Sequence, residues 1–249
     1  MTDLVLYTVD DGVAEIALNR PDKKNAITLN MYEQAVSYLE QAATDENVRV
    51  VLLRGEGQSF CAGNDIQDFV SGMGSRENLK GVVSFLHHIV TYNKPLMAAV
   101  QGNAVGIGTT MMMHCDLVIA SEDLKCQMPF VHLGLVPEAG ATLIIPSMLG
   151  QRQAFELLVE GRPFGAQKAQ QSGLVNVIAE VETYLEVARE RAQALARLPK
   201  EAVLESKRLM KKQYQENLLA VIDEELEVFY ERLFSDEARQ AFMAFLQKS

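Results

Sequence analysis

The alternation of apolar and polar positions at the start of the chain predicts a β-hairpin followed by a buried strand. Two apolar runs, LVLYTV at 4–9 and VAEIALNR at 13–20, flank Asp11–Gly12. An Asp-Gly pair between such runs favours a tight turn that joins antiparallel strands. VRVVLLRG at 48–55 is apolar at consecutive positions, which is typical of a strand in a sheet that is covered on both faces.

A helix is expected between the hairpin and this strand. Asn30 is followed three residues later by Glu33, and this spacing resembles a capping box, the pair of side chains that caps a helix start. The helix would begin there and continue through Gln41.

A unit of strand, glycine-bearing turn and helix then recurs along the chain. It occupies residues 50–70 and 95–115 and, in a looser form, 116–150. The repetition lies in the structural scheme rather than in copied sequence, so it predicts the stacked turns of a spiral. Alternating strands and helices also describe a doubly wound parallel sheet, which is the alternative.

After about Gly150, amphipathic helical patterns replace the strands. Pro199 separates two of them, and Ser235–Asp236 can cap the last. The apolar faces of such helices must be buried, either on the spiral or on a neighbouring subunit. The predicted helical segments are 151–161, 166–173, 181–198, 200–214, 217–234 and 237–247.

Charge and composition narrow the possible partners. The 249 residues are 48% hydrophobic and 22% charged, as in an ordinary globular protein, and the formal net charge is −10. An acidic chain is a poor partner for nucleic acid or an anionic membrane, although a local basic patch can still bind a small anion. The sequence has neither an apolar run of membrane-spanning length nor a signal-peptide pattern at its start. We therefore expect a cytoplasmic protein.

The cysteines and histidines give little support to a metal site. The chain has three Cys and four His, without an HExxH or CxxC pattern. Cys61, Cys115 and Cys126 are odd in number and lie among apolar residues, which favours reduced thiols. His114, next to Cys115, is expected to pack inside a buried helix.

The stretch VQGNAVGIGTTMMMHCD at 100–116 places Gly106 and Gly108 between an apolar strand and a buried helix. Such a turn lets a ligand approach the backbone closely. A dinucleotide fingerprint needs a third small residue where this chain has Met111, although an acidic pair does follow roughly 20 residues later. The match to dinucleotide binding is therefore incomplete.

The other interpretation of these glycines is an oxyanion hole. Two turns, CAGND at 61–65 and GIG at 106–108, each end a strand and open a helix. If the turns converge, each supplies one backbone N–H to an oxygen that becomes negative during a reaction. Two ordinary glycine turns would have the same sequence.

Four segments, taken together and in this order, resemble the enoyl-CoA hydratase/isomerase, or crotonase, superfamily. These segments are NRPDKKNAI (19–27), SFCAGNDI (59–66), VQGNAVGIGTTMMMHCDLVIAS (100–121) and MPFVHLGLVPEAGAT (128–142). The resemblance implies an α/β fold, a crotonase-type spiral of ββα repeats followed by a C-terminal helical region that builds homotrimers, often paired into hexamers. We accordingly expect a spiral core domain over 1–195 and a C-terminal helical region over 196–249. An acyl-coenzyme A thioester is the implied substrate, with no other cofactor.

The resemblance also assigns roles to individual positions. The family's two oxyanion N–H groups fall on Asn64 and Ile107, and only their backbones are implicated. Without the resemblance, the lysines of the RPDKKNAI loop would be read as solvated charges. The positions that match the family's coenzyme A contacts are Lys23, Lys24, Ala62 and Ile66.

Three further positions bear on the reaction. Hydratases of this superfamily use two glutamates to activate water, at positions that are Thr110 and Phe130 here, so ordinary hydratase activity is not expected. Glu138, in GLVPEAGAT, instead matches the catalytic glutamate of peroxisomal-type Δ3,Δ2-enoyl-CoA isomerases. Apolar neighbours on both sides would raise the pKa of this carboxyl toward the range of a general base.

The resemblance therefore implies isomerisation of a 3-enoyl-CoA to a 2-enoyl-CoA, with Glu138 moving a proton from C2 to C4. Two other acyl-CoA enzymes stay open, namely an aryl-CoA isomerase acting on epoxide or oxepin substrates and a hydratase-like enzyme. A non-catalytic acyl-CoA-binding protein and a dinucleotide-binding oxidoreductase are the alternatives from other classes. Basic residues over 207–212 could also reach the coenzyme A phosphates of a neighbouring subunit, although a solvated basic face is the simpler interpretation.

Overall fold

The computed structural model describes residues 3–68 and 79–247. Within these residues, six strands form the main sheet, which is parallel except where its first two strands pair as a hairpin. In spatial order they are β1 (Val5–Asp10), β2 (Val13–Leu18), β3 (Val50–Gly55), β4 (Leu96–Val100), β6 (Leu117–Ser121) and β9 (Val177–Ala179).

The predicted hairpin between β1 and β2 is confirmed. Its turn consists of Asp11 and Gly12, with φ values of 44° and 79°. Two successive positive φ angles match the right-handed twist of the strands that the turn joins, and Asp-Gly tolerates them.

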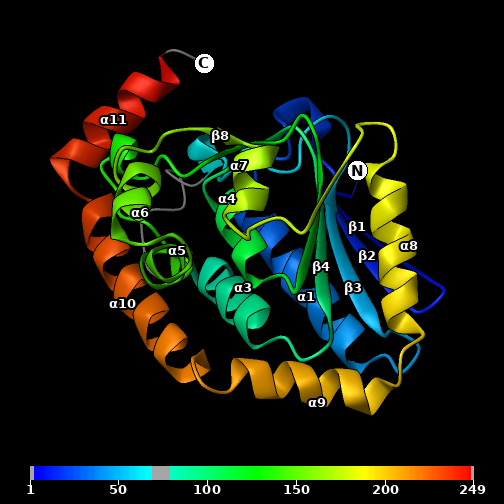
Figure 1. The fold of residues 1–249 in the computed structure, drawn as a ribbon. Helices are drawn as coiled ribbons and strands as arrows, with labels where there is room; N and C mark the ends of the chain where they lie inside the picture. The colour runs from blue at the N-terminus through cyan, green and yellow to red at the C-terminus, as the bar shows by residue number, and fades with distance from the viewer. Residues whose placement is uncertain (1–2, 69–78, 248–249) are drawn as a thin grey trace.

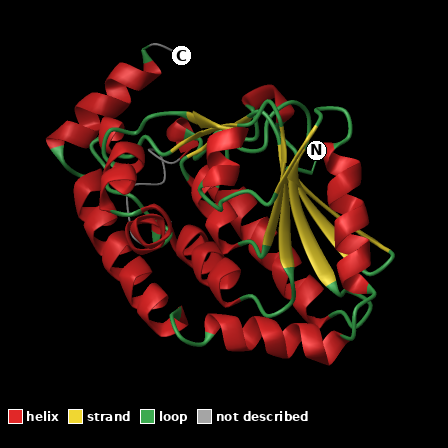
Figure 2. Ribbon diagram, viewed as in Figure 1, coloured by secondary structure: helices red, strands yellow, loops and turns green. Residues whose placement is uncertain are grey.

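Helices cover both faces of the main sheet, as the apolar run at 48–55 predicted (Figure 1). One face packs on α8 (Tyr184–Ala196), toward which β3 directs Val50 and Leu52. The other face lies in the larger core beside α1 (Leu29–Thr44) and α3 (Lys80–Thr91). Figure 2 shows the strands gathered between these helices.

The start of α1 differs from the prediction. Thr28, not Asn30, is the N-cap, and its side chain accepts a hydrogen bond from the Met31 amide at 3.3 Å. Thr28 has the extended backbone of a cap residue (φ −89°, ψ 164°), whereas Asn30 already lies inside the helix. The amide of Leu29, the first residue of the helix, donates to the Asp68 carboxylate at 2.7 Å, so a tertiary contact completes the cap.

The repeated unit is a spiral, and the doubly wound alternative is wrong. The chain alternates between the main sheet and a second sheet, formed by β5 (Asn103–Val105), β7 (Lys125–Gln127) and β8 (Phe164–Gly165), since β5 follows β4 and β7 follows β6. Single parallel bridges from Ile27 to Asn64 and from Cys61 to Ala104 extend this second layer. The end of the first predicted unit, 69–70, lies outside the described residues.

The turns of the spiral and the C-terminal part of the chain supply the remaining described helices. Short 3-10 segments in the described ranges include η1 (Pro21–Lys23), η3 (Met111–His114) and η4 (Val131–Leu133). The helices are α4 (Ile107–Thr110), α5 (Ala141–Leu149), α6 (Gln151–Leu158), α7 (Ala166–Gln171), α9 (Lys200–Lys211), α10 (Gln215–Leu233) and α11 (Asp236–Leu246).

The last three helices run as an arc around the spiral (Figure 1). Ser235 caps α11 as predicted, because its hydroxyl oxygen accepts from the Ala238 amide at 3.1 Å. α10 packs against α3 and α5, and α11 packs against η4, so these helices bury apolar surface on the spiral. Among the described residues, no helix is both long enough and apolar enough to cross a membrane.

Candidate active site

The two glycine turns converge at the start of α4. The Val105 amide donates to the Cys61 carbonyl at 2.9 Å, which ties the second turn to the first. A Cβ added at Gly108 would lie 2.4 Å from that same carbonyl oxygen, so only glycine permits this approach. Gly106, with φ 54° and ψ −121°, reverses the chain so that α4 can begin at Ile107.

This convergence leaves two backbone amides available. In the parallel bridge, the Ile27 amide donates to Gly63 O and the Asp65 amide donates to Ile27 O, both at 2.8 Å, so the Asn64 N–H points to the other side. Ile107 is the first residue of α4, and a first amide has no acceptor within its helix. Within the part of the chain that the structure describes, neither amide has a backbone acceptor.

Both residues line one cavity of about 910 Å³. The cavity is also lined by every residue that the sequence assigned to coenzyme A, namely Lys23, Lys24, Ala62 and Ile66. The structure therefore brings the predicted oxyanion and ligand-binding positions together around one space. The lysines are exposed, as expected of groups at its rim.

A buried asparagine shapes the loop that bears these lysines. Asn25 is fully buried, and its amide donates to Glu56 O at 2.8 Å and to Ser59 O at 2.7 Å. Its side-chain oxygen accepts from the Arg20 amide at 2.8 Å. The Arg20 guanidinium in turn pairs with Asp65 at 2.9 Å, and both line the cavity. Sequence patterns did not predict these contacts, because polar residues in loops look alike before their partners are known.

The C-terminal helices form another part of the cavity wall, which was not predicted from the sequence. Phe229 of α10 lines the cavity, as do Ala241, Phe242, Ala244 and Phe245 of α11. The signal was present as the unassigned apolar face of the segment 237–247. In the structure this segment packs against η4 and lines the cavity.

Glu138 lies in the protein interior beside α4. Its side chain is only 6% exposed, and the Thr110 hydroxyl donates to its Oε1 at 2.5 Å. Thr110 is three residues after Ile107, so the carboxyl lies next to the helical turn that begins with the Ile107 amide. Among the described residues, Glu138 is not one of those that line the cavity.

The environment of Glu138 disfavours its charged form. Burial raises the pKa of this carboxyl to about 8, the negative charge of Glu225 adds to the rise, and the hydrogen bond from Thr110 opposes it. Such a value lies near the range in which a carboxyl can both take and return a proton at neutral pH. The apolar setting predicted for Glu138 from its neighbours is present.

Unusual backbone angles place Glu138. Ala139 and Gly140, which follow it, have φ values of 61° and 73°. His114 Nε2 lies 2.8 Å from the Ala139 carbonyl oxygen. Burial lowers the pKa of His114 to about 4, so the imidazole is neutral and its N–H donates. His114 packs in the interior as expected, and it also stabilises this turn.

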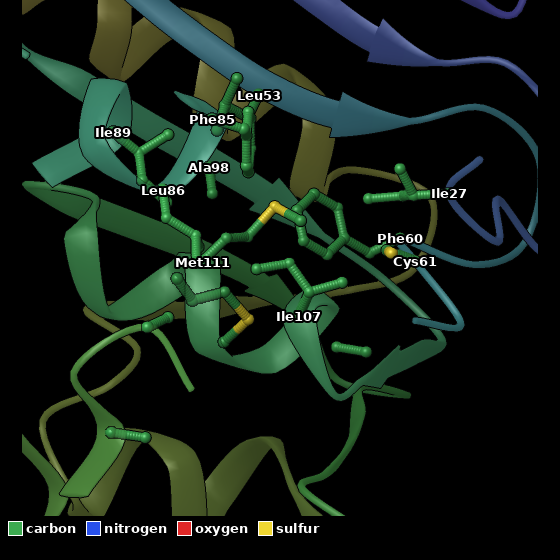
Figure 3. Packing of buried hydrophobic residues seen from close by; sticks show 14 of the residues in the cluster. Ile27, Leu53, Phe60, Cys61, Phe85, Leu86, Ile89, Ala98, Ile107 and Met111 are labelled. Atoms are coloured by element: carbon green, nitrogen blue, oxygen red, sulfur yellow. The ribbon is translucent and has the colours of Figure 1, made fainter. Parts of the chain in front are cut away.

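Behind the two glycine turns lies a dense apolar cluster. Phe60 and Cys61 lie beside Ile27, Ile107 and Met111 in this cluster (Figure 3). At its edge, the buried Tyr32 hydroxyl donates to the Asn64 side-chain oxygen at 2.6 Å. Tyr32 was not predicted to contribute to the site, since its position in α1 resembles that of any core aromatic residue.

The residues of the basic segment 207–212 differ in their exposure to solvent. Lys207 is buried, where its ammonium group donates to Asp116 at 2.6 Å and to the Lys94 carbonyl at 2.7 Å. For Lys207, both the predicted solvated face and the contact with a neighbour's phosphates are therefore wrong. Its aliphatic stem packs into the interior, and its ammonium group forms an ion pair with Asp116 there.

Comparison with known proteins identifies the family. A model of the enoyl-CoA hydratase/isomerase family matches residues 8–249. The chain belongs to this family. It is 35% identical to enoyl-CoA delta isomerase 2 of Rattus norvegicus over 249 residues, which cover 98% of this chain and 63% of the relative. The chain thus spans less than two thirds of the length of that relative.

Two further comparisons define the fold and the breadth of the family. The structure of Pseudomonas aeruginosa OdaA superposes with a TM-score of 0.94 at 43% identity, covering 98% of this chain and 99% of that one. The 2,3-dehydroadipyl-CoA hydratase of Escherichia coli (strain K12) is 30% identical, covering 100% of this chain and 97% of the relative. The fold is therefore the α/β crotonase fold, with two sheets followed by C-terminal helices. The relatives that the chain matches include both isomerases and hydratases.

Proposed function

We propose that this enzyme is a Δ3,Δ2-enoyl-CoA isomerase with Glu138 as its single base and acid. The observation that carries the proposal is one buried carboxyl, with a pKa near 8, beside the helical turn that offers the Ile107 amide. Thr110 and Phe130 stand where two hydratase glutamates would be, and Thr110 donates to Glu138. No pair of carboxylates is present at those positions to activate a water.

The reaction follows from these groups. The thioester oxygen of a 3-enoyl-CoA accepts hydrogen bonds from the Asn64 and Ile107 amides, which acidifies the C2 proton. The Glu138 carboxylate removes that proton, and the resulting dienolate keeps its negative charge on the oxygen. The protonated Glu138 then returns the proton at C4, and the double bond moves to C2–C3. One base serves both carbons, and a general base of this kind contributes roughly 10²–10⁴-fold.

Coenzyme A would bind along the rim of the cavity. Lys23 and Lys24 are exposed there and offer positive charge to phosphates on an otherwise acidic protein. Ala62 and Ile66, on either side of Asn64 in the sequence, line the same cavity. The acyl chain would pass the two amides and bring C2 and C4 to Glu138.

The assembly that we infer is a homotrimer or a pair of trimers. The exposed side of α9 includes Leu209 and Met210, which are 59% and 69% exposed in the single chain. Large apolar side chains at such exposure are typical of surfaces buried between subunits. We assign residues 1–195 to the spiral core and residues 196–249 to the helical region that would form this contact. Light scattering coupled to gel filtration measures the assembled mass and tests it.

The deciding experiment compares wild type with Glu138→Gln on trans-3-hexenoyl-CoA, following formation of the conjugated 2-enoyl thioester. Isomerisation by wild type that is lost in the variant, with acyl-CoA binding retained by calorimetry, is the expected result. The same preparations are tested for hydration of crotonyl-CoA. Efficient hydration would overturn the argument from Thr110 and Phe130. Wild type inactive on both substrates would refute the aliphatic isomerase and direct the assay to aryl-CoA epoxides.

A further inference from the structure

A second buried carboxylate lies behind the turn that bears Glu138. Glu225, on α10, is 6% exposed. It accepts hydrogen bonds from the Gly140 amide at 2.6 Å, the Thr142 amide at 2.9 Å and the Thr142 hydroxyl at 2.5 Å. Three donors from one short segment thus converge on a side chain more than 80 residues away in the sequence.

These hydrogen bonds satisfy the start of α5. The helix begins at Ala141, and the first amides of a helix have no acceptor within it. Gly140 occupies the cap position but has no side chain to cap with. A carboxylate from another helix takes this place and also interacts favourably with the positive end of the helix dipole.

The turn needs such support because its backbone is unfavourable. Ala139 has φ 61°, a left-handed conformation that a residue with a Cβ rarely adopts. α10 also approaches very closely, since a Cβ added at Gly140 would lie 2.3 Å from a Leu218 side-chain carbon. The conformation that directs Glu138 is therefore imposed by packing and hydrogen bonds from α10, together with the His114 contact to the Ala139 carbonyl.

We propose that Glu225 is a positioning residue for catalysis, which holds the turn 138–140 in the conformation that presents Glu138 and places a negative charge behind it. The proposal rests on the proposed function insofar as Glu138 is taken to be the base. It goes beyond that function because it makes α10, in the C-terminal helical region, a component of the active site. Both carboxylate oxygens of Glu225 accept hydrogen bonds from Gly140 and Thr142, so we assign its action to this turn and not to a substrate.

Among the residues that the structure describes, several charged and titratable groups lie around the two carboxyls, including His114 at the Ala139 carbonyl. Two other carboxyls act on or are affected by Glu225: Glu138, which lies on the turn, and the exposed Glu224, which lies on the same helix as Glu225. Glu138 is near Thr110, and its charge reaches the buried Tyr32 hydroxyl and the Cys61 thiol. Burial raises the pKa of Glu225, while its three hydrogen bonds favour the charged form.

Four variants separate positioning from simple stabilisation. Glu225→Gln keeps the shape of the side chain but removes its negative charge. It also places an NH2 donor where an oxygen accepts from the Gly140 or Thr142 backbone amide. Thr142→Val removes only the hydroxyl donor, and Thr142→Ser restores it as the matched control. Glu224→Gln removes an exposed charge one residue away on the same helix. Circular dichroism and thermal melting first establish that each variant is folded at the assay temperature.

For Glu225→Gln, kcat on trans-3-hexenoyl-CoA should fall roughly 10- to 100-fold with KM within about twofold of wild type, because the base is misplaced and coenzyme A binding is not. The midpoint of the kcat–pH profile should also move to lower pH. Thr142→Val should lose part of kcat, and Thr142→Ser and Glu224→Gln should stay near wild type. A folded Glu225→Gln with unchanged kcat and midpoint overturns the proposal, even if its melting temperature has dropped.

A spectroscopic readout keeps this test independent of turnover. The protonated Glu138 carboxyl gives an infrared C=O band, which is assigned by its disappearance in Glu138→Gln. Its titration midpoint should fall in Glu225→Gln whether or not the enzyme isomerises hexenoyl-CoA. If the Glu138 midpoint shifts in Glu225→Gln but wild type does not isomerise hexenoyl-CoA, only the proposed function is refuted. If wild type isomerises hexenoyl-CoA but the Glu138 midpoint does not shift in Glu225→Gln, only the positioning role is refuted. If Glu225→Gln does not fold, the Thr142→Val and Thr142→Ser pair decides by the same two measurements.

Discussion

The hydrogen bond from Thr110 to Glu138 controls the pH at which the proposed base is available. Replacing Thr110 by Val removes the donor at 2.5 Å with little change in volume. A hydrogen bond to a charged group contributes about 1.5–3 kcal/mol, and 1.36 kcal/mol corresponds to one pH unit of pKa. Since this bond stabilises the ionised carboxylate, its loss should raise the pKa of Glu138 above its value of about 8 by roughly one to two pH units.

The consequence for activity depends on pH. With a pKa of about 8, about one tenth of Glu138 is ionised at pH 7 in wild type. In Thr110→Val the ionised fraction, and with it kcat, should fall a further roughly 10- to 100-fold at pH 7. Above the new pKa, kcat should recover toward the wild-type plateau.

The assay is kcat for trans-3-hexenoyl-CoA isomerisation measured from pH 6 to pH 10, with Thr110→Ser as the matched control. Serine keeps the hydroxyl, so its profile should follow that of wild type. A Thr110→Val profile whose midpoint is unchanged or moves to lower pH would refute the reasoning. A uniform loss at all pH values would show that Thr110 acts through geometry and not through the ionisation of Glu138.

Three further predictions concern stability and ligand binding. The pKa of Glu138 is about 8 in the folded protein and about 4.3 in the unfolded chain. The neutral carboxyl therefore contributes its full stability below about pH 4.3, and this stability is lost as pH rises through about 8. Glu138→Gln should therefore reduce the decline in melting temperature between pH 6 and pH 9. Gly108→Ala should destabilise the fold by at least about 2 kcal/mol in urea titrations, because its Cβ would meet the Cys61 carbonyl at 2.4 Å, and it should abolish turnover. Lys23→Ala combined with Lys24→Ala should raise KM for acyl-CoA, most strongly at low salt, and leave kcat unchanged in steady-state assays.

Local patterns predicted much of the fold because they depend on neighbouring residues alone. The Asp11–Gly12 turn, the buried strand that contains Val50 and the Ser235 cap were all predicted from short stretches, and all are present. The cap of α1 was mistaken because Asn30 and Glu33 satisfied a local pattern, whereas Thr28 was favoured by its extended backbone and by Asp68 next to it in space.

In the candidate site, too, some positions were predicted from the sequence and others were not. The glycine turns at 61–65 and 106–108 indicated backbone amides at strand ends, and the family resemblance assigned the two positions to Asn64 and Ile107. The partners of Glu138 could not be located, since Thr110 and Glu225 are 28 and 87 residues away from it along the chain. Their polar side chains have no pattern that distinguishes them from surface residues.

By itself, the sequence determined where chain direction changes, which positions are buried and which carboxyl lies in an apolar setting. These properties follow from backbone sterics and hydrophobic periodicity, and both act over a few residues. Only the tertiary structure decided that the two glycine turns meet, that α11 closes one side of the cavity and that a carboxylate from α10 caps the turn behind Glu138. These contacts join segments far apart in the chain, and the strength of each hydrogen bond and the pKa of each buried group depend on the distances and burial that folding creates.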